Sequence, residues 1–242
     1  MTTTAAATTV LVTGANKGLG REAVRRFATM GWRVLLAARD VERGSAAIRE
    51  LAAEGLHADF VPMDITSDES VQAAVDLVRT HTRHLDVLVN NAGVGAPATP
   101  PGETRAADVG VVFETNVVGT IRVTNAFLPL LQAGENPRIV MVSSGMGSIA
   151  TMTDPASAGL APPALGYPAS KAALNMITSQ YARALPGIRI NAVDPGYTAT
   201  DLTAHRGFQT VTEGTDAIVD LADIDATGPT GGFFDRSGRT PW

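Results

Sequence analysis

The sequence predicts an α/β fold, a single-domain doubly wound parallel sheet, on the basis of three observations. Short apolar runs alternate with amphipathic stretches along most of the 242 residues. The runs are continuously apolar, as in strands that helices cover on both faces. No linker-like composition interrupts the alternation before residue 145, so residues 1–242 are expected to form one domain.

Six apolar runs are expected to be the strands of this sheet. They are rich in β-branched residues or leucine and end at polar or glycine residues, as buried strands do. In chain order they cover residues 9–14, 33–39, 58–64, 85–93, 138–144 and 188–196.

Five amphipathic stretches between the runs are expected to be helices. The third carries a helix-start signature, because Thr66 or Ser67 can act as N-cap before acidic residues. The five stretches cover residues 18–30, 40–54, 67–82, about 105–133 and 166–185.

Two stretches lack periodicity and are expected to be long loops. Residues 145–166 hold three prolines and form an extended loop before the last predicted helix, and the second stretch covers about 197–211. Loops of this length in a compact domain are usually functional or mobile. Both follow predicted strands, at the edge where open α/β sheets bind ligands.

Composition excludes several classes of partner. The net charge is −5 with no block of like charge, so no nucleic-acid partner is expected. The absence of cysteine excludes disulfides and thiolate metal ligands. No apolar run approaches the roughly 18 residues that span a bilayer, and the N-terminus lacks a signal-peptide pattern. A cytoplasmic protein without a membrane partner is therefore expected.

The four histidines are scattered, so no metal site is expected. Only His205 falls in the second irregular stretch, where it is a candidate for substrate contact. The others are expected on the surface: His57, His81 and His84.

A glycine-rich turn, "TGANKGLG", follows the first predicted strand and opens the first predicted helix. Its glycines are Gly14, Gly18 and Gly20. Glycine permits a tight turn and lets a pyrophosphate approach the free amides of a helix N-terminus. The turn therefore predicts a dinucleotide site, with a plain tight turn as the alternative.

The end of the second strand bears on the choice of dinucleotide. An acidic residue about 20 positions after the glycines would hold a ribose 2′-hydroxyl, and Asp40 lies at that distance. Asp40 also stands where the next helix needs an N-cap, directly after Arg39. An arginine at the strand end suits a 2′-phosphate, so NADP is favoured over NAD.

The stretch "GYPASKAALN" contains one of only two lysines in the chain. Tyr167 and Lys171 are four residues apart, so they share a face if the stretch is helical. A tyrosine of ordinary pKa, near 10, gives up its proton reluctantly at neutral pH. A nearby ammonium stabilises the phenolate, so the pair predicts a proton-exchanging tyrosine, and an ordinary surface contact is the alternative.

Taken together, these motifs resemble those of the short-chain dehydrogenase/reductase family, which has a Rossmann-type fold. They occur in family order over nearly the whole chain: "TGANKGLG", "DI" at Asp64–Ile65, "NNAG" at 90–93, "TN" ending at Asn116, "VSS" ending at Ser144, "YPASK" at 167–171 and "DPG" at 194–196.

The resemblance implies roles for individual residues. Tyr167 would be the general acid in reduction, and Lys171 would lower its pKa and hold the nicotinamide ribose. Ser144 would bond the carbonyl oxygen, Asn116 would anchor a proton-relaying water, and Thr198 would hold the nicotinamide carboxamide. The implied cofactor-binding set is Gly14, Asn16, Lys17, Gly18, Leu19, Gly20, Arg39, Asp64, Ile65, Asn90, Ala92, Gly93, Tyr167, Lys171, Pro195, Gly196 and Thr198.

One departure from the family pattern indicates a particular branch of the family. Ser144 and Tyr167 are 23 residues apart, further than in many members. This insertion, "AARDVERG" and the ending "GPTGGFFDRSGRTPW" are similar to the carbonyl-reductase branch. That similarity implies NADPH-dependent reduction of a ketone or aldehyde by a monomer, with a dimer as the alternative. An NAD-dependent alcohol dehydrogenase and a non-catalytic NADP-sensing protein stay open as other functions.

Overall fold

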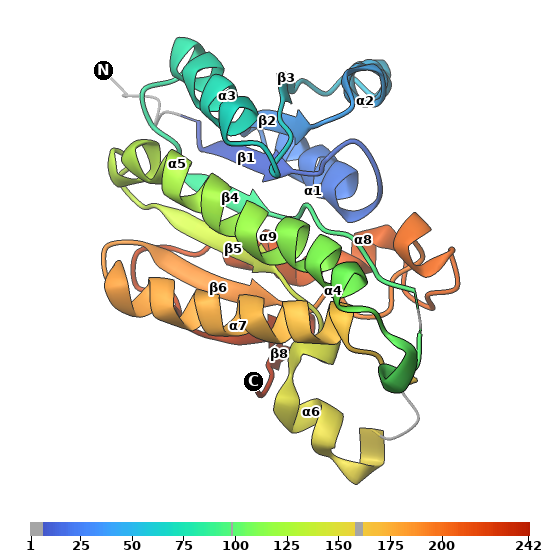
Figure 1. Cartoon of the computed structure of the whole chain (residues 1–242). Coiled ribbons are helices and arrows are strands. Elements are labelled where there is room, and N and C mark those ends of the chain that lie inside the picture. The colour runs from blue at the N-terminus through green and yellow to red at the C-terminus, as the bar shows by residue number, and fades with distance from the viewer. Residues whose placement is uncertain (1–6, 98, 158–161) are drawn as a thin grey trace.

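The fold is built on one sheet with helices on both faces (Figure 1). The computed structural model describes residues 7–97, 99–157 and 162–242, and in these ranges eight strands form the order β3-β2-β1-β4-β5-β6-β7-β8. Neighbours are parallel, except that β8 is antiparallel to β7. The strands are β1 Thr9–Thr13, β2 Arg33–Ala38, β3 Asp59–Pro62, β4 Val87–Asn90, β5 Arg138–Val142, β6 Arg189–Val193, β7 Phe233–Asp235 and β8 Gly238–Arg239.

The predicted fold class is confirmed, and each of the six predicted strands is present but shorter than its apolar run. The run 85–93 shortens most, because the chain leaves the sheet after Asn90. Strands β7 and β8 were not predicted from the sequence. Their only apolar signal is the pair Phe233–Phe234, which is too short to predict a strand.

The helices are α1 Gly18–Thr29, α2 Val41–Ala53, α3 Asp68–His81, α4 Ala106–Phe113, α5 Thr120–Gln132, α6 Ile149–Thr153, α7 Gly166–Ala184, α8 Val211–Gly214 and α9 Asp216–Ala222. The prediction of a single helix over about 105–133 is wrong in detail. A π-helical segment, Glu114–Gly119, separates α4 from α5. Helices α6, α8 and α9 are not predicted either, because they are short and lie in or beyond the two irregular stretches. Short 3₁₀ turns cover Pro101–Glu103, Gly145–Gly147, Pro155–Ser157 and Asp201–Thr203.

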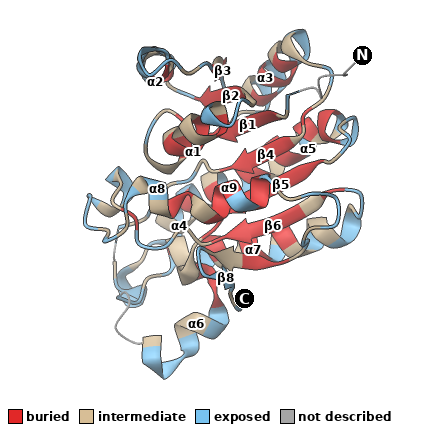
Figure 2. Ribbon diagram, turned by 180° about the vertical axis from the view of Figure 1, so that it is seen from behind, coloured by how far each residue is buried: buried red, intermediate tan, exposed pale blue. Residues whose placement is uncertain are grey.

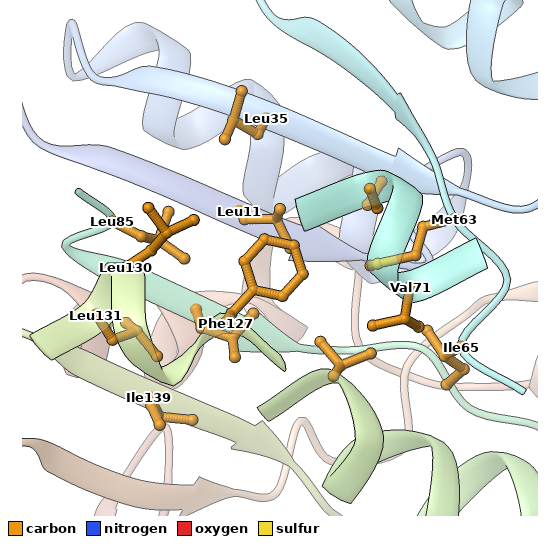
Figure 3. Packing of buried hydrophobic residues seen from close by; sticks show 14 of the residues in the cluster. Leu11, Leu35, Met63, Ile65, Val71, Leu85, Phe127, Leu130, Leu131 and Ile139 are labelled. Atoms are coloured by element: carbon orange, nitrogen blue, oxygen red, sulfur yellow. The ribbon is translucent and has the colours of Figure 1, made fainter. Parts of the chain in front are cut away.

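Two apolar layers, one on each face of the sheet, hold the helices in place. Successive residues of a strand enter opposite layers, so Leu11 packs on one face while Val10 and Val12 pack on the other. The first layer joins the strands to α3, α5 and α7, with Phe127 of α5 lying beside Leu11 (Figure 3). The second layer joins them to α1, α2 and α9. Burial is accordingly concentrated in the strands (Figure 2).

The insertion before α7 contains more local structure than its composition predicts. It forms two 3₁₀ turns and α6, which projects from the body beyond the carboxyl end of β5 (Figure 1). No residue of α6 is buried, and Ile149 is 69% exposed. Helix α6 therefore adds little to the core. Part of the predicted loop, residues 158–161, lies outside the described residues.

The register brings the ends of four strands to one edge of the sheet. Val12 lies opposite Val89, and Val142 lies opposite Val193, with β4 and β5 paired between them. The turns that follow β1, β4, β5 and β6 therefore meet at this edge. Within the described ranges, no helix combines the length and the apolar character needed to cross a membrane.

Candidate active site

A cleft of about 810 Å³ opens at this edge of the sheet. It runs from the glycine-rich turn, past the ends of β2 to β5, to α7 and the segment after β6. Fourteen of the seventeen predicted cofactor-binding residues line it: Gly14, Asn16, Lys17, Gly18, Leu19, Gly20, Arg39, Asp64, Ile65, Ala92, Gly93, Tyr167, Lys171 and Pro195.

The glycine-rich turn has a conformation that other residues would strain. Gly14 and Gly18 have φ of +62° and +57°, and a Cβ on Gly14 would lie 2.8 Å from the Cα of Ala92. Helix α1 begins at Gly18 without any side-chain cap. Its first amides are therefore free to bind an anion in the cleft.

The turn after β4 is fastened to the glycine-rich turn by Asn91, which the sequence analysis did not select. Its side-chain amide donates to the carbonyls of Thr13 (2.8 Å) and Gly14 (3.2 Å). Asn90, which was selected, is 4% exposed and donates to Thr124 Oγ1 at 3.0 Å. Its side chain faces the core, so of the two asparagines it is Asn91 that lines the cleft.

Two arginines stand at the far end of the cleft. Arg39 is exposed and lines the cleft together with Arg43, a residue the sequence analysis missed. Asp40 caps α2 as predicted, accepting a hydrogen bond from the Arg43 amide at 3.0 Å. Asp64 is also held in a turn, where hydrogen bonds from Thr66 keep its pKa below its usual range. This end of the cleft therefore combines cationic side chains with an ordered carboxylate.

At the other end, α7 presents Tyr167 and Lys171 on one face, as their spacing predicts. The Lys171 ammonium lies 5.6 Å from the centre of the Tyr167 ring and donates to the carbonyl of Val142 at 2.8 Å. Lys171 is only 4% exposed, and burial lowers its pKa to about 8. This lysine is therefore a desolvated cation beside the phenol.

In this structure the pKa of Tyr167 is raised instead of lowered, and the predicted influence of Lys171 on it stays a prediction. Burial raises the pKa of Tyr167 to about 12, a hydrogen bond with Ser144 opposes the rise, and the charge of Asp194 adds to it. The largest cause of the rise is the cost of placing a phenolate in a desolvated site. The phenol is therefore protonated at neutral pH.

The side chains of the two serines after β5 make different contacts. Ser143 is buried and donates to Asn175 Oδ1 at 2.5 Å, so it attaches α7 to the sheet. Ser144 is half-buried, lies close enough to Tyr167 to oppose the rise in its pKa, and accepts a hydrogen bond from the Met146 amide at 3.2 Å. Ser144, the predicted residue, is therefore the serine next to the phenol. The serine that lines the cleft is Ser143.

Asn116 lies behind the cleft, in the π-helical segment between α4 and α5. Both ends of its side-chain amide form hydrogen bonds. Oδ1 accepts from the Val94 amide at 2.8 Å. Nδ2 donates to the Val94 carbonyl and to Ser170 Oγ, both at 3.0 Å. A Cβ on Gly93 would lie 3.2 Å from this Oδ1 and 3.6 Å from the Lys171 nitrogen. Asn116 thus orders the strand-end turn beside Lys171, and the water it is predicted to anchor stays a prediction.

The segment after β6 closes one side of the cleft. Asp201 and His205 both line it, and the Asp201 carboxylate contacts Lys17 at 2.6 Å and His205 at 2.9 Å. Thr198 is 2% exposed and donates to the Pro195 carbonyl at 2.9 Å. Neither Thr198 nor Gly196 lines the cleft, although both were predicted to bind the cofactor. Four apolar residues of the two irregular stretches do not line the cleft either: Met146, Met152, Tyr197 and Phe208.

These features fit a dinucleotide with a 2′-phosphate. The cleft offers free amides at a helix start, a backbone cradle at Gly14 that a Cβ would fill, and arginines at the end opposite Tyr167. For a metal ion, in contrast, the part of the chain that the structure describes contains no suitable cluster of histidines and carboxylates.

Comparison with known proteins agrees with this geometry. The sequence profile of the family described as short chain dehydrogenase matches residues 8–209. The chain belongs to the short-chain dehydrogenase family.

Individual members of the short-chain dehydrogenase family match along nearly their whole length. Short-chain dehydrogenase/reductase 1 of Saponaria officinalis is 33% identical over 96% of this chain and 95% of its own. Human carbonyl reductase [NADPH] 1 is 32% identical over 96% and 97%. The crystal structure of NADPH-bound carbonyl reductase from chicken fatty liver superimposes with a TM-score of 0.85 at 29% identity, covering 98% and 100% of the two chains.

Proposed function

We propose that this chain reduces a ketone or aldehyde to an alcohol with NADPH. The observation that carries the proposal is the convergence of Tyr167, Lys171 and Ser144 at one end of a cleft that fits a dinucleotide. The likeness to carbonyl reductases, one of which binds NADPH, supports the same activity.

The chain's own groups would bind and orient the cofactor, which supplies the hydride. The amides at the start of α1 would hold its pyrophosphate, and Arg39 with Arg43 would hold a 2′-phosphate. Lys171 would hold the nicotinamide ribose from α7. These contacts place the substrate carbonyl beside Tyr167 and Ser144 and supply part of the rate through positioning.

Proton transfer would then use Tyr167 in its protonated form. The Ser144 hydroxyl would donate a hydrogen bond to the carbonyl oxygen as negative charge develops there. The phenol of Tyr167 would pass its proton to the same oxygen. An alkoxide is more basic than a phenolate, so this transfer is favourable even from a phenol whose pKa is about 12.

Other activities remain as alternatives that one experiment separates. The chain is mixed with NADPH and a panel of ketones, aldehydes, quinones and steroids, and the loss of NADPH absorbance is followed. We expect alcohol formation from at least one carbonyl class, with higher kcat/KM for NADPH than for NADH. Saturable NADPH binding without turnover would instead indicate a sensing protein, and preference for NADH would indicate an NAD-dependent dehydrogenase.

We further propose that the protein works as a cytoplasmic monomer. The insertion that carries α6 projects next to the start of α7 and would obstruct a partner helix there (Figure 1).

A further inference from the structure

Leu202 is an apolar side chain that lines the cleft without belonging to the core. It lies in the segment after β6, is 55% exposed and packs in neither apolar layer. Burying such a side chain against a ligand is favourable, because apolar surface is then removed from water. Ligand sites are lined mostly by apolar side chains for the same reason. Leu202 is therefore a candidate for contact with the apolar part of a substrate.

The side chain of Leu202 reaches the turn after β4, which runs beside the start of α7. A Cβ on Gly95 would lie 3.0 Å from Leu202 Cδ1, and both residues line the cleft. A Cβ on Gly166 would lie 3.4 Å from the Cβ of Ala96, and Gly166 directly precedes Tyr167. Consecutive residues of one turn thus lie next to Leu202 and next to the residue before the phenol. Only the absence of a side chain at residue 95 leaves room between Leu202 and this turn.

The backbone on either side of Leu202 is anchored. Asp201 forms an ion pair with Lys17 of the glycine-rich turn, with 2.6 Å between the charged groups. Thr203 Oγ1 donates to the Thr198 carbonyl at 2.7 Å. An exposed ion pair adds little to stability, but this one joins the segment after β6 to the opposite side of the cleft. Leu202 is therefore part of a cleft wall with a defined position.

We propose that Leu202 is a specificity-determining residue, which with Gly95 limits the size of the substrate group that fits beside Tyr167. The inference rests on the proposed function and adds the class of carbonyl that is reduced. A ketone with one small apolar group beside its carbonyl, such as a methyl ketone, would be preferred over a ketone branched on both sides. The Leu202 side chain has no hydrogen-bonding atom, so a polar group buried against it would lack a partner.

The expected size of the effect follows from the cost of fitting extra atoms into an apolar site. One methylene group changes kcat/KM by roughly ten- to 200-fold in such a pocket. The Leu202 side chain is partly exposed and can change its rotamer, so the lower end of this range applies. Replacing it by Ala removes no contact of the two apolar layers, and the variant is expected to fold normally.

The test compares two ketones that differ only beside the carbonyl: acetophenone, which has a methyl group there, and isobutyrophenone, which has an isopropyl group. The ratio of their kcat/KM values with NADPH is expected to favour acetophenone in the unchanged chain. Leu202→Ala should shift this ratio toward isobutyrophenone by about tenfold, because the shortened side chain leaves room for the branched group.

Gly95→Ala provides the converse test. The added methyl group narrows the space in front of Leu202, so the ratio should shift further toward acetophenone. Gly95 does not have a positive φ, so its backbone conformation is open to alanine. When Gly95→Ala is combined with Leu202→Ala, its effect on the ratio should become much smaller, because the neighbouring side chain is gone. An equal effect of Gly95→Ala with and without Leu202 would contradict the proposed contact.

Binding measurements separate this inference from the proposed function. Calorimetric titration of the two ketones into the chain with NADP⁺ gives the ratio of their affinities even if neither ketone is reduced. Phe208→Ala is the matched control, because Phe208 lies on the same segment, is 83% exposed and does not line the cleft. An unchanged ratio in Leu202→Ala would overturn the proposal. So would an equal change in Phe208→Ala, or the absence of binding by both ketones.

Discussion

Lys171 is a cation that the fold has desolvated. It is 4% exposed, and its hydrogen bond to the Val142 carbonyl accompanies a pKa lowered by burial to about 8. The charged form of such a group is disfavoured in the folded state relative to the unfolded chain, where its pKa is about 10.5. Below pH 8 the folded protein therefore carries a destabilising contribution, which disappears as pH rises to about 10.5.

Replacing Lys171 by Met should therefore remove activity and stabilise the fold at neutral pH. Because the two pKa values differ by about 2.5 units, the gain in the free energy of unfolding is at most about 3 kcal/mol at pH 7. Urea denaturation at pH 7 and pH 10.5 measures it, and the difference between variant and unchanged chain should shrink at the higher pH. A variant that is less stable at both values would contradict this account of Lys171.

At the scale of elements, the junction between β2 and α2 combines a helix cap with two arginines that line the cleft. Asp40 is occupied as the cap of α2, which leaves the arginines on either side of it facing the cleft. A carboxylate that accepts from a helix amide is a poor partner for a ribose hydroxyl. The adjacent arginines are well suited to a phosphate.

Arg39→Asp should therefore reduce the preference for NADPH over NADH. Loss of a charge-assisted contact with phosphate is expected to lower the ratio of the two kcat/KM values by about tenfold to a hundredfold. Arg49→Asp is the matched control, because it makes the same charge change on α2 at an exposed residue outside the cleft. An unchanged ratio in Arg39→Asp, or an equal loss in the control, would show that Arg39 does not select the cofactor.

Elements with a continuous local signal were predictable from the sequence, and those set by tertiary contacts were not. The central strands show uninterrupted apolar runs, whereas β7 is placed by pairing with β6 and has only two apolar residues. The π-helical segment around Asn116 leaves no trace in the spacing of apolar residues. Within the site, the order of the motifs predicted Tyr167, Lys171 and Ser144. The places of Asn91 and Arg43 in the cleft depend on tertiary contacts that no motif shows.

At the scale of the whole molecule, one sheet edge gathers every group that the proposed chemistry needs. The glycine-rich turn follows β1, the arginines follow β2, and the side chains proposed for catalysis follow β5 or lie on α7. The described residues of the insertion with α6 contribute to neither apolar layer. We therefore expect this surface segment to affect the oligomeric state of the protein more than its stability.

Sedimentation equilibrium should accordingly give the mass of one chain, 25.1 kDa. The projecting α6 segment is expected to obstruct pairing through α7 at micromolar concentrations. A stable mass of two or four chains would contradict the proposed monomer while leaving the proposed chemistry untouched.

We propose that the Tyr167 hydroxyl delivers the proton while the rest of the cleft binds the dinucleotide. The Tyr167→Phe variant tests this claim when it is assayed for kcat/KM on a carbonyl that the unchanged chain reduces and for NADPH binding by fluorescence titration. We expect kcat/KM to fall by about 10³-fold, the scale of a lost general acid, with NADPH affinity nearly unchanged. Turnover close to that of the unchanged chain would contradict the claim.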